Sequence, residues 1–588
     1  MNPFLCQLNC TTDGQFTHQQ LDNTYFETES FTLMWQGKLY NVQQLKELLD
    51  SSDVNKKDYS IERTILALFS KFNTSLFGKL RGKFAIVIWD KVNETLYGAR
   101  DHFGIESLYY VEENNRFYAT NFKRKIKDMI HFRTTVDTRA LQHYFTFQYV
   151  PEPLTLIENY YKLQAGHYFI KRTKEPLKIA AYFIPKFSKS DTKQDCKIDE
   201  IRQALVEAIS ERIPREKQIG TFLSGGIDST IITAIAQRIN PNIKAYTIGF
   251  SEAGYSEVKL AARTAKSLGI EHQSIMITPE KFIESLPAIV YHLEDPLADP
   301  SAIPLYIGCQ EVAAEVDILL SGEGADEMFG GYEIYREHRS LKLFNYVPSL
   351  LQDSLLQLSK RMPTGTKGKS FLYRGLTPLK NRYLGNAKIF TEQEKSTLLH
   401  NYCPNHKSQD WTKELFDQVE HKHPTEQMQF IDWYTWLPGD ILFKASRLSQ
   451  VSGISIRLPF VDRKIFDIAS QLTVEDKITR QHTKAILREA AKGIIPDHVL
   501  EEKKRGFPVP LKKWLRHDLY IWANRQIKYA KTDQFINKNY ALHLLREHSR
   551  GKHDHSRKLW TIIIFNMWYE MVIEESNLLE EPWRLSLH

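Results

Sequence analysis

The chain has 588 residues, of which 42% are hydrophobic and 25% charged, a composition typical of soluble globular proteins. No apolar run approaches the roughly 20 residues of a membrane span, and the first residues lack the basic and apolar regions of a signal peptide. We therefore expect a cytoplasmic protein of about two to four domains. The five cysteines form no C-x-x-C pair, which argues against a disulfide framework and a zinc site. A net charge of +7 over this length does not indicate nucleic-acid binding.

Residues 1–185 are predicted to be mostly strand with a few helices. Apolar runs at 31–35, 83–90, 95–98 and 108–110 are joined by short polar turns, and a helical pattern runs through Leu45, Leu48 and Leu49. These strand pairs suit an antiparallel sheet. Residues 186–197 are polar and lack apolar periodicity, so we predict an interdomain linker there.

From residue 198 the pattern alternates between helix and strand. Helices are predicted at 198–213, 231–239, 257–268, 280–292 and 303–315, and strands at 219–223, 245–250, 273–277 and 316–320. This order predicts a parallel sheet with helices on both faces, which binds ligands beyond the carboxyl ends of its strands. Beyond Gly331 the chain is predicted to form a helical annex that walls in the substrate.

A glycine turn, Ser224 to Ser229, joins the strand 219–223 to the following helix. Glycines let the backbone approach a phosphate, and amides at a helix start point their partial positive charge toward it. Asp228 could hold a divalent metal against the same phosphates. The alternative is an ordinary tight connection, but the string SGGIDS looks like the pyrophosphate loop of enzymes that split ATP into AMP and pyrophosphate. The chain has no G-x-x-x-x-G-K-[ST] string, which argues against a kinase-type or GTPase-type loop.

A second glycine turn, Ser321 to Glu327, directly follows the strand 316–320. Its glycines offer amides to an anion, and Asp326 brings a second carboxylate toward Asp228. Two acids beside one polyphosphate repel each other unless a cation lies between them, and Mg²⁺ prefers one or two carboxylates plus phosphate oxygens. The alternative is a glycine-rich loop whose acids are solvated.

Strings along nearly the whole chain are similar to those of asparagine synthetases, notably SGGIDS, SGEGADEMFGGY and ARDHFGIESLYY. The resemblance implies an α/β fold with two domains. Residues 1–185 would form an αββα glutaminase-like (Ntn) domain, and residues 198–588 a doubly wound, parallel-sheet pyrophosphate-loop ATPase domain with a helical annex. The implied activity is that of an ATP-dependent amide ligase. A carboxylate attacks the α-phosphate of Mg-ATP, and an amine then displaces AMP from the acyl-adenylate.

The resemblance also assigns site residues. Asp228 and Asp326 would bind Mg²⁺, Lys484 and Lys504 would neutralise the departing pyrophosphate, and Glu294 would accept a proton at the amine step. Taken singly, each lysine is more often a surface residue, and Glu294 could simply end a helix. Lys484 is predicted to lie in a helix, residues 482–488, whereas Arg447 and Arg457 are expected to be scaffold ion pairs. The predicted ATP contacts are Leu223, Ser224, Gly225, Gly226, Asp228, Ser229, Ile248, Ser321, Gly322 and Glu323.

One departure from the family affects the source of the amine. The glutaminase nucleophile of the family is a cysteine directly after the initiator Met, where this chain has Asn2. That nucleophile uses its own α-amino group as base, so Cys6 or Cys10 could replace it only after cleavage of the preceding residues. Gln36 also replaces the asparagine usual before Gly37. We therefore expect that glutamine hydrolysis is lost and that the domain remains as a structural partner.

The leading hypothesis is a lasso-type peptide cyclase, in which the N-terminal amine of a leader-trimmed precursor peptide closes on an Asp or Glu side chain. A leader peptidase and a leader-binding protein are partners that this hypothesis implies. The alternatives are an asparagine synthetase using ammonia or glutamine, and an intramolecular amide synthesis like that of β-lactam synthetases. An RNA-modifying protein with the same loop is disfavoured, because no basic patch is interleaved with aromatic residues. The sequence does not indicate an oligomeric state.

Overall fold

Two antiparallel sheets form the N-terminal half of the computed structural model, which describes residues 3–10, 16–20, 25–49, 58–129, 134–188, 194–252, 254–362, 366–502, 506 and 508–576. The first sheet has the strand order β2-β1-β8-β7-β9 and the second the order β11-β10-β6-β5-β4-β3. The strands of the first are β1 (Phe4–Asn9), β2 (Phe16–Gln20), β7 (Tyr109–Glu113), β8 (Arg116–Thr120) and β9 (Tyr160–Lys162). The strands of the second are β3 (Tyr25–Glu27), β4 (Phe31–Leu39), β5 (Gly82–Asp90), β6 (Thr95–Arg100), β10 (His167–Arg172) and β11 (Lys178–Ala181).

The two sheets pack face to face and carry helices on their outer faces. Cys6 and Leu8 of β1 meet Val87 of β5 in the apolar layer between the sheets. On the far side of the second sheet lie α1 (Val42–Glu47) and α2 (Ile61–Phe72). The hydroxyl of Ser60 caps α2 by accepting from the Arg63 amide, and the buried residues of α2 recur at helical spacing.

The first sheet faces the short helix α3 (Lys123–Met129) and the C-terminal half. Val111 and Tyr118 on this face belong to the same continuous apolar core as the parallel sheet of the C-terminal half. The order of layers is therefore helix, sheet, sheet, helix, which confirms the predicted αββα class. It also means that the two halves share buried surface instead of meeting at a thin contact.

The C-terminal half is built on a parallel five-stranded sheet of order β14-β13-β12-β15-β16. Its strands are β12 (Ile219–Phe222), β13 (Lys244–Phe250), β14 (Glu271–Ile277), β15 (Ile318–Leu320) and β16 (Ser455–Arg457). The chain proceeds outward from β12 to β13 and β14 on one side, then returns to add β15 on the other side. The direction of winding therefore reverses between β12 and β15, and such a switch point is where doubly wound sheets bind ligands.

Several predicted boundaries are corrected by the structure. The helix expected at 198–213 is α5 (Gln194–Ser210), so it begins inside the segment predicted as linker, of which residues 189–193 lie outside the described part of the chain. The helix expected at 280–292 is two helices, α8 (Pro279–Glu284) and α9 (Leu286–Leu293), each with a proline in its first turn. Proline lacks an amide hydrogen, so the first turn of a helix is where it fits.

The remaining core helices agree with the predicted alternation. The helix after the first glycine turn is α6 (Ile227–Ile239), the next is α7 (Val258–Leu268), and α10 (Ala302–Val312) precedes β15. No helix within the described residues is both long and apolar enough to cross a membrane.

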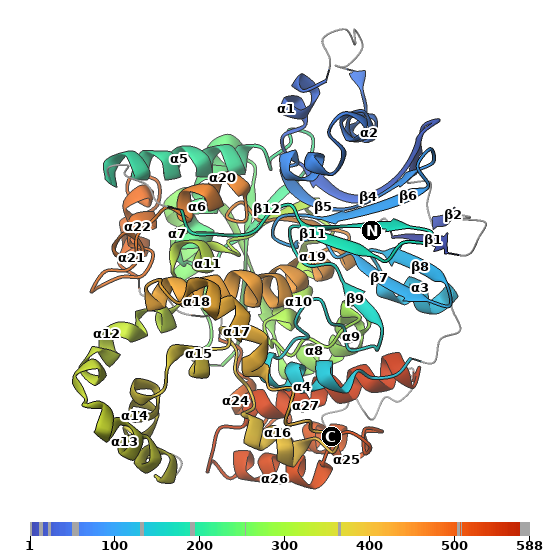
Figure 1. The fold of residues 1–588 in the computed structure, drawn as a ribbon. Coiled ribbons are helices and arrows are strands. Elements are labelled where there is room, and N and C mark those ends of the chain that lie inside the picture. The colour runs from blue at the N-terminus through green and yellow to red at the C-terminus, as the bar shows by residue number, and fades with distance from the viewer. Residues whose placement is uncertain are drawn as a thin grey trace.

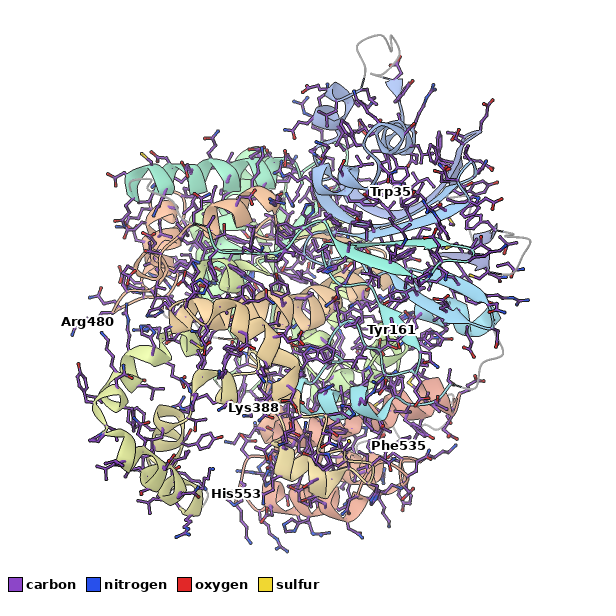
Figure 2. All side chains as sticks on the ribbon, viewed as in Figure 1. Trp35, Tyr161, Lys388, Arg480, Phe535 and His553 are labelled. Atoms are coloured by element: carbon purple, nitrogen blue, oxygen red, sulfur yellow. The ribbon has the colours of Figure 1, made fainter. Side chains whose placement is uncertain are left out.

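Beyond β15 the described residues form helices and one further strand, β16, which the sequence did not predict. Figure 1 shows the last of these helices at the bottom of the picture and others higher up on the left, beside the parallel-sheet half. The C-terminal helix α27 (Ser556–Trp568) lies beside α4 (Thr138–Phe147) of the N-terminal half, and the Tyr144 hydroxyl donates to the Thr561 carbonyl at 2.9 Å. Figure 2 shows side chains filling the space between the ribbons, with Trp35 in the sheet of the N-terminal half. The helices are α11 (Ala325–Phe329), α12 (Glu337–Leu341), α13 (Ser349–Arg361), α14 (Lys369–Leu376), α15 (Leu379–Arg382), α16 (Glu392–Leu398), α17 (Ser408–Val419), α18 (Pro424–Tyr434), α19 (Leu442–Val451), α20 (Arg463–Ala469), α21 (Val474–Lys477), α22 (Ala485–Ala491), α23 (Asp497–Leu500), α24 (Leu511–Trp514), α25 (Tyr520–Lys528), α26 (Lys538–Ser549) and α27 (Ser556–Trp568).

Candidate active site

The first glycine turn leaves β12 at the carboxyl edge of the sheet and starts α6. Gly225 has φ +78°, and a Cβ there would lie 2.7 Å from Leu260, so both conformation and space require glycine. The hydroxyl of Ser229 accepts from the Ser224 amide at 3.1 Å, and the Ser224 hydroxyl accepts from the Gly226 amide at 3.3 Å. These bonds hold the turn in shape at the start of α6, where backbone amides favour an anion.

The second glycine turn leaves β15, the neighbour of β12, at the same edge. A Cβ on Gly322 would lie 3.0 Å from Cβ of Asp228 and 3.1 Å from the Ser229 amide, so the two turns are in direct contact. Gly324 has φ +89° and leads into α11, which carries Asp326. Because β12 and β15 are adjacent and parallel, both turns and their acidic residues meet at the switch point.

Lys484 joins the two predicted metal-binding carboxylates. Its Nζ lies 2.6 Å from Oδ2 of Asp228 and 2.7 Å from Oδ1 of Asp326, and the residue is only 1% exposed. A Cβ on Gly331 would collide with both Asp326 Oδ1 and Lys484 Cε, so a glycine is required beside this pair. The predicted helix at 482–488 is wrong at its start. Lys484 has φ +54° and precedes α22, and this left-handed conformation belongs to the segment that carries its side chain to the two aspartates.

Two of the predicted ATP contacts, Ile248 and Leu223, lie on β13 and directly after β12. Ile248 is half-buried, and its Cδ1 would lie 2.6 Å from a Cβ on Gly308, so α10 packs closely against it. Leu223 is buried, its amide donates to the Tyr246 carbonyl at 2.8 Å, and its carbonyl accepts from the Thr247 hydroxyl at 2.5 Å. The backbone of Leu223 is thus already used in joining β12 to β13.

Two family models match the chain. The model described as Asparagine synthase covers residues 200–570, and the one described as Glutamine amidotransferase domain covers residues 15–183. The chain belongs to the asparagine synthase family. It is 42% identical over 556 residues to "Asparagine synthetase [glutamine-hydrolyzing] 1" of Bacillus subtilis strain 168, covering 95% of this chain and 88% of that protein. It is 38% identical over 559 residues to "Putative asparagine synthetase [glutamine-hydrolyzing]" of Mycobacterium bovis, covering 93% and 85%.

More distant similarities are weaker. "Amidase chry2" of Gibberella zeae is 25% identical over 534 residues, covering 81% of this chain and 77% of that protein. Among solved structures, a glutamine phosphoribosylpyrophosphate amidotransferase of B. subtilis in complex with ADP and GMP aligns with 46% of this chain and 59% of its own, at 11% identity and a TM-score of 0.21. As a member of the asparagine synthase family, the protein is an ATP-dependent carbon–nitrogen ligase.

This asparagine synthase family member also has a buried acid beside the Asp228–Asp326 pair. Glu327 follows Asp326 on α11 and is 1% exposed, and its Oε1 accepts from the Tyr332 hydroxyl at 2.6 Å. Burial, together with the negative charge of Asp326, raises the pKa of Glu327 to about 8. The sequence analysis did not single out Glu327, because nothing in SGEGADE distinguishes a buried acid from a solvated one.

Glu294 of this synthase-family chain is held by the N-terminal half. Its carboxylate accepts from the amides of Lys123 at 3.1 Å and Arg124 at 2.8 Å, and it pairs with Arg447 Nη2 at 2.7 Å. Glu294 is 2% exposed and ends α9 with φ +61°. These three partners of the carboxylate lie outside both glycine turns. The expectation that Arg447 forms a scaffold ion pair agrees with this arrangement, and a role for Glu294 at the amine step stays a prediction.

A buried lysine between two aspartates lies near the second turn. Lys444 Nζ is 2.8 Å from Asp440 Oδ1 and also contacts Asp299 Oδ2. Burial opposes the charge of Lys444, but the two carboxylates outweigh it and, with the nearby Glu323, hold the pKa of Lys444 above its ordinary value. Gln148, at the end of α4, donates to Asp440 Oδ2 at 2.7 Å, so the N-terminal half contributes to this cluster. The sequence analysis missed the cluster because its members are far apart along the chain.

Two positions on which the sequence-based predictions depend are not described by the structure. Lys504 and Asn2 lie outside the described part of the chain. Among the described residues there is no group of three or more His, Cys, Asp or Glu side chains placed to hold a metal ion. The two carboxylates at Lys484 are therefore a pair, as suits an ion that takes most of its ligands from phosphate and water.

Proposed function

We propose that this ligase adenylates a side-chain carboxylate of a peptide and closes it onto the N-terminal amine of the same peptide, as a lasso-type macrolactam synthetase. The adenylation half of this proposal rests on the two contacting turns. Amides of Gly225 and Gly226 would bind the phosphates of ATP, with Asp228 and Asp326 holding Mg²⁺ against them. The ion supplies charge neutralisation for the departing pyrophosphate.

The residues at the switch point fit a bound Mg-ATP. Two carboxylates converge on one position that a cation, the ammonium of Lys484, fills. With Mg²⁺ bound to the carboxylates, the same ammonium would be free to contact phosphate oxygens, where charge develops as pyrophosphate leaves. Lys504, which lies outside the described residues, is proposed to serve the same step. Glu327 keeps its proton near neutral pH and therefore adds no third negative charge to the pair.

The observation that carries the peptide-amine proposal is the environment of the N-terminal cysteines. Cys6 is fully buried between the sheets, its thiol donates to the Ala119 carbonyl at 3.4 Å, and burial raises its pKa to about 12. A thiol with that pKa has almost no nucleophilic thiolate at neutral pH. Cleavage before Cys6 would also remove Phe4, a 1% exposed residue of the inter-sheet core. Cys10 follows β1 and is half-buried, and burial raises its pKa as well.

The surface between the halves supports the same view. Lys83 and Glu106 of the N-terminal half form a buried ion pair at 3.1 Å, and the Gln450 amide of α19 donates to Glu106 at 2.7 Å. Gln36, which replaces the asparagine expected before Gly37, also donates to Glu106. These side chains satisfy one another, as a structural interface requires.

A second candidate is an asparagine synthetase that uses ammonia or glutamine. It is favoured by the 42% identity to the B. subtilis asparagine synthetase over nearly the whole chain. Both candidates share adenylation of a side-chain carboxylate, but they differ in the amine and in the molecule that carries the carboxylate.

The experiment offers the purified protein two substrates in parallel with ATP and Mg²⁺. The proposal predicts that a leader-trimmed precursor peptide yields a product lighter by one water, with AMP and pyrophosphate released. Formation of asparagine from aspartate and ammonia, with no change in the peptide, would reject macrolactam formation and select the second candidate. With aspartate as the other substrate, glutamine should yield no more asparagine than the ammonia that contaminates it.

A further inference from the structure

A helical extension leaves the body of the protein beyond α12. It comprises the short 3-10 helix η4 (Lys342–Tyr346), α13 and α14, and we call residues 341–376 the arm. Figure 1 shows α13 and α14 at the lower left, at the end of this extension and away from the sheets. Its base is tied to the body by Arg374, which pairs with Glu337 at 3.0 Å, and by Arg339, which donates to the Ile478 carbonyl at 2.8 Å.

The arm is only two helices thick and cannot bury both of its faces. Its interior is small: the Phe344 and Phe371 rings meet edge to face at 5.1 Å, and a Cβ on Gly375 would collide with Phe344. Leu355 and Leu356 on α13 are half-buried. Among the described residues, the main packing partner of α13 is α14.

Apolar side chains are concentrated on the uncovered part of the arm. Six of the seventeen large hydrophobic side chains that are exposed among the described residues lie here, in a segment of 29 residues. Leu350 is 90% exposed, Tyr346 84% and Leu343 72%. Leu351 and Leu358, seven residues apart, share one face of α13. Isolated exposed leucines need no explanation, but such a concentration on one protrusion indicates a surface that something covers.

The charges of the arm specify the kind of surface that would cover it. Residues 341–376 contain six lysines and arginines, and Asp353 is the one acidic residue among them. Lys342, Lys360, Arg361 and Lys367 are all exposed. Exposed leucines and aromatics combined with lysine and arginine are the pattern of helices that lie in the interface of an anionic membrane.

We propose that the arm is a docking surface for an anionic phospholipid bilayer, with its exposed leucines and tyrosine entering the headgroup region and its basic residues contacting lipid phosphates. The geometry favours a bilayer over a peptide or a protein. A protein or peptide partner is usually anchored in a concave, desolvated pocket, whereas the exposed leucines and the tyrosine of the arm protrude with 53–90% of their surface free. The inference does not rest on the proposed substrate, because it concerns where the enzyme binds and not what it joins.

The test is co-sedimentation of the full-length protein with large unilamellar vesicles. Vesicles of phosphatidylglycerol and phosphatidylcholine in equal parts should pellet the protein, and binding to pure phosphatidylcholine should be at least tenfold weaker. High salt should release the protein, because exposed charges are screened. Lys360→Glu with Arg361→Glu should weaken binding by roughly 30-fold or more, the weight of two basic contacts to an anionic surface.

Matched variants separate position from net charge. Lys174→Glu with Lys552→Glu changes the charge of the chain equally at exposed residues outside the arm and should leave binding unchanged. Leu350→Asp should reduce binding roughly tenfold, while Val92→Asp, at a 74% exposed position in the N-terminal half, should not. All four variant proteins should exchange pyrophosphate into ATP at the rate of the unaltered protein, and this activity would show that they are folded.

Three outcomes would overturn the proposal. The first is equal binding of the protein to both kinds of vesicle. The second is that the arm variants bind as strongly as the unaltered protein, and the third is that the control variants lose as much binding as the arm variants. If Leu350→Asp instead converts a dimer into a monomer by light scattering, with no vesicle binding by either form, the arm is a contact between two copies of the chain and the lipid proposal is wrong.

Discussion

Replacing Lys484 by methionine should destabilise the protein and make its stability depend on Mg²⁺. Methionine keeps most of the length of the side chain but removes the ammonium that lies between Asp228 and Asp326. Both carboxylate oxygens are within 2.7 Å of that nitrogen, which keeps them about 5 Å or less apart. At an effective dielectric constant of about 20, two unit charges at that separation repel each other by about 3 kcal/mol.

The assay is thermal unfolding without ATP, in EDTA and in millimolar Mg²⁺. In EDTA the Lys484→Met protein should unfold several degrees below the unaltered protein, because a buried charged group left without its partner costs about 3 kcal/mol or more. Mg²⁺ should recover much of that loss by taking the vacated position. The unaltered protein should respond weakly, since its ammonium already neutralises both aspartates.

Lys477→Met is the matched control. Lys477 is also a fully buried lysine, but burial lowers its pKa to about 7 and its Nζ approaches the Gln429 amide oxygen instead of a carboxylate. Its replacement should cost no stability near pH 7 and confer no response to Mg²⁺. The reasoning is refuted if Lys484→Met unfolds like the unaltered protein in EDTA, or if Mg²⁺ stabilises both methionine variants equally.

Three further predictions concern single buried groups. The pKa of Glu327 is raised to about 8 in the folded protein, so the unfolded state loses this proton first as the pH rises above about 4.5. The free energy of unfolding therefore falls between pH 4.5 and pH 8. Glu327→Gln should raise the unfolding midpoint at pH 8 and leave it nearly unchanged at pH 5, and an equal gain at both pH values would contradict this prediction. Native alkylation at pH 8 should label the exposed Cys196 and spare Cys6 until denaturant is added, whereas labelling of Cys6 at a similar native rate would show that its strand opens readily. Arg447→Met should lower the free energy of unfolding by about 3 kcal/mol, because it leaves the Glu294 carboxylate without its positive partner. Adding Glu294→Gln to this variant should recover part of the lost unfolding midpoint. No recovery would mean that the two residues are not coupled.

The meeting of the two glycine turns could be predicted because it follows from general rules of parallel sheets. Glycine strings directly after two apolar runs mark the carboxyl ends of strands, and those ends share one edge. The adjacency of β12 and β15, which the sequence did not specify, then brings Asp228 and Asp326 together. Fold class and family were predictable for the same reason: they rest on long, regular patterns.

The partners of those acids could not be predicted, because they depend on long-range packing. Lys484 lies far along the chain from Asp326, and the local string HTKAILR looks helical throughout, whereas Lys484 itself is left-handed. For Glu294 the local expectation was right, because the residue does end a helix. The sequence did not show that the N-terminal half also binds its carboxylate. β16 has three residues, too few for a pattern, and exists because β15 offers it a free edge.

The central claim is that both glycine turns and their aspartates bind one Mg-ATP, and exchange of labelled pyrophosphate into ATP in the presence of the carboxylate substrate tests it most directly. Asp228→Asn and Asp326→Asn should each reduce exchange by roughly a hundredfold or more. Asp317→Asn, which alters a partly exposed acid just before β15 at the opposite edge of the same sheet, should leave the exchange intact. Exchange at the unaltered rate in either turn variant would contradict the account.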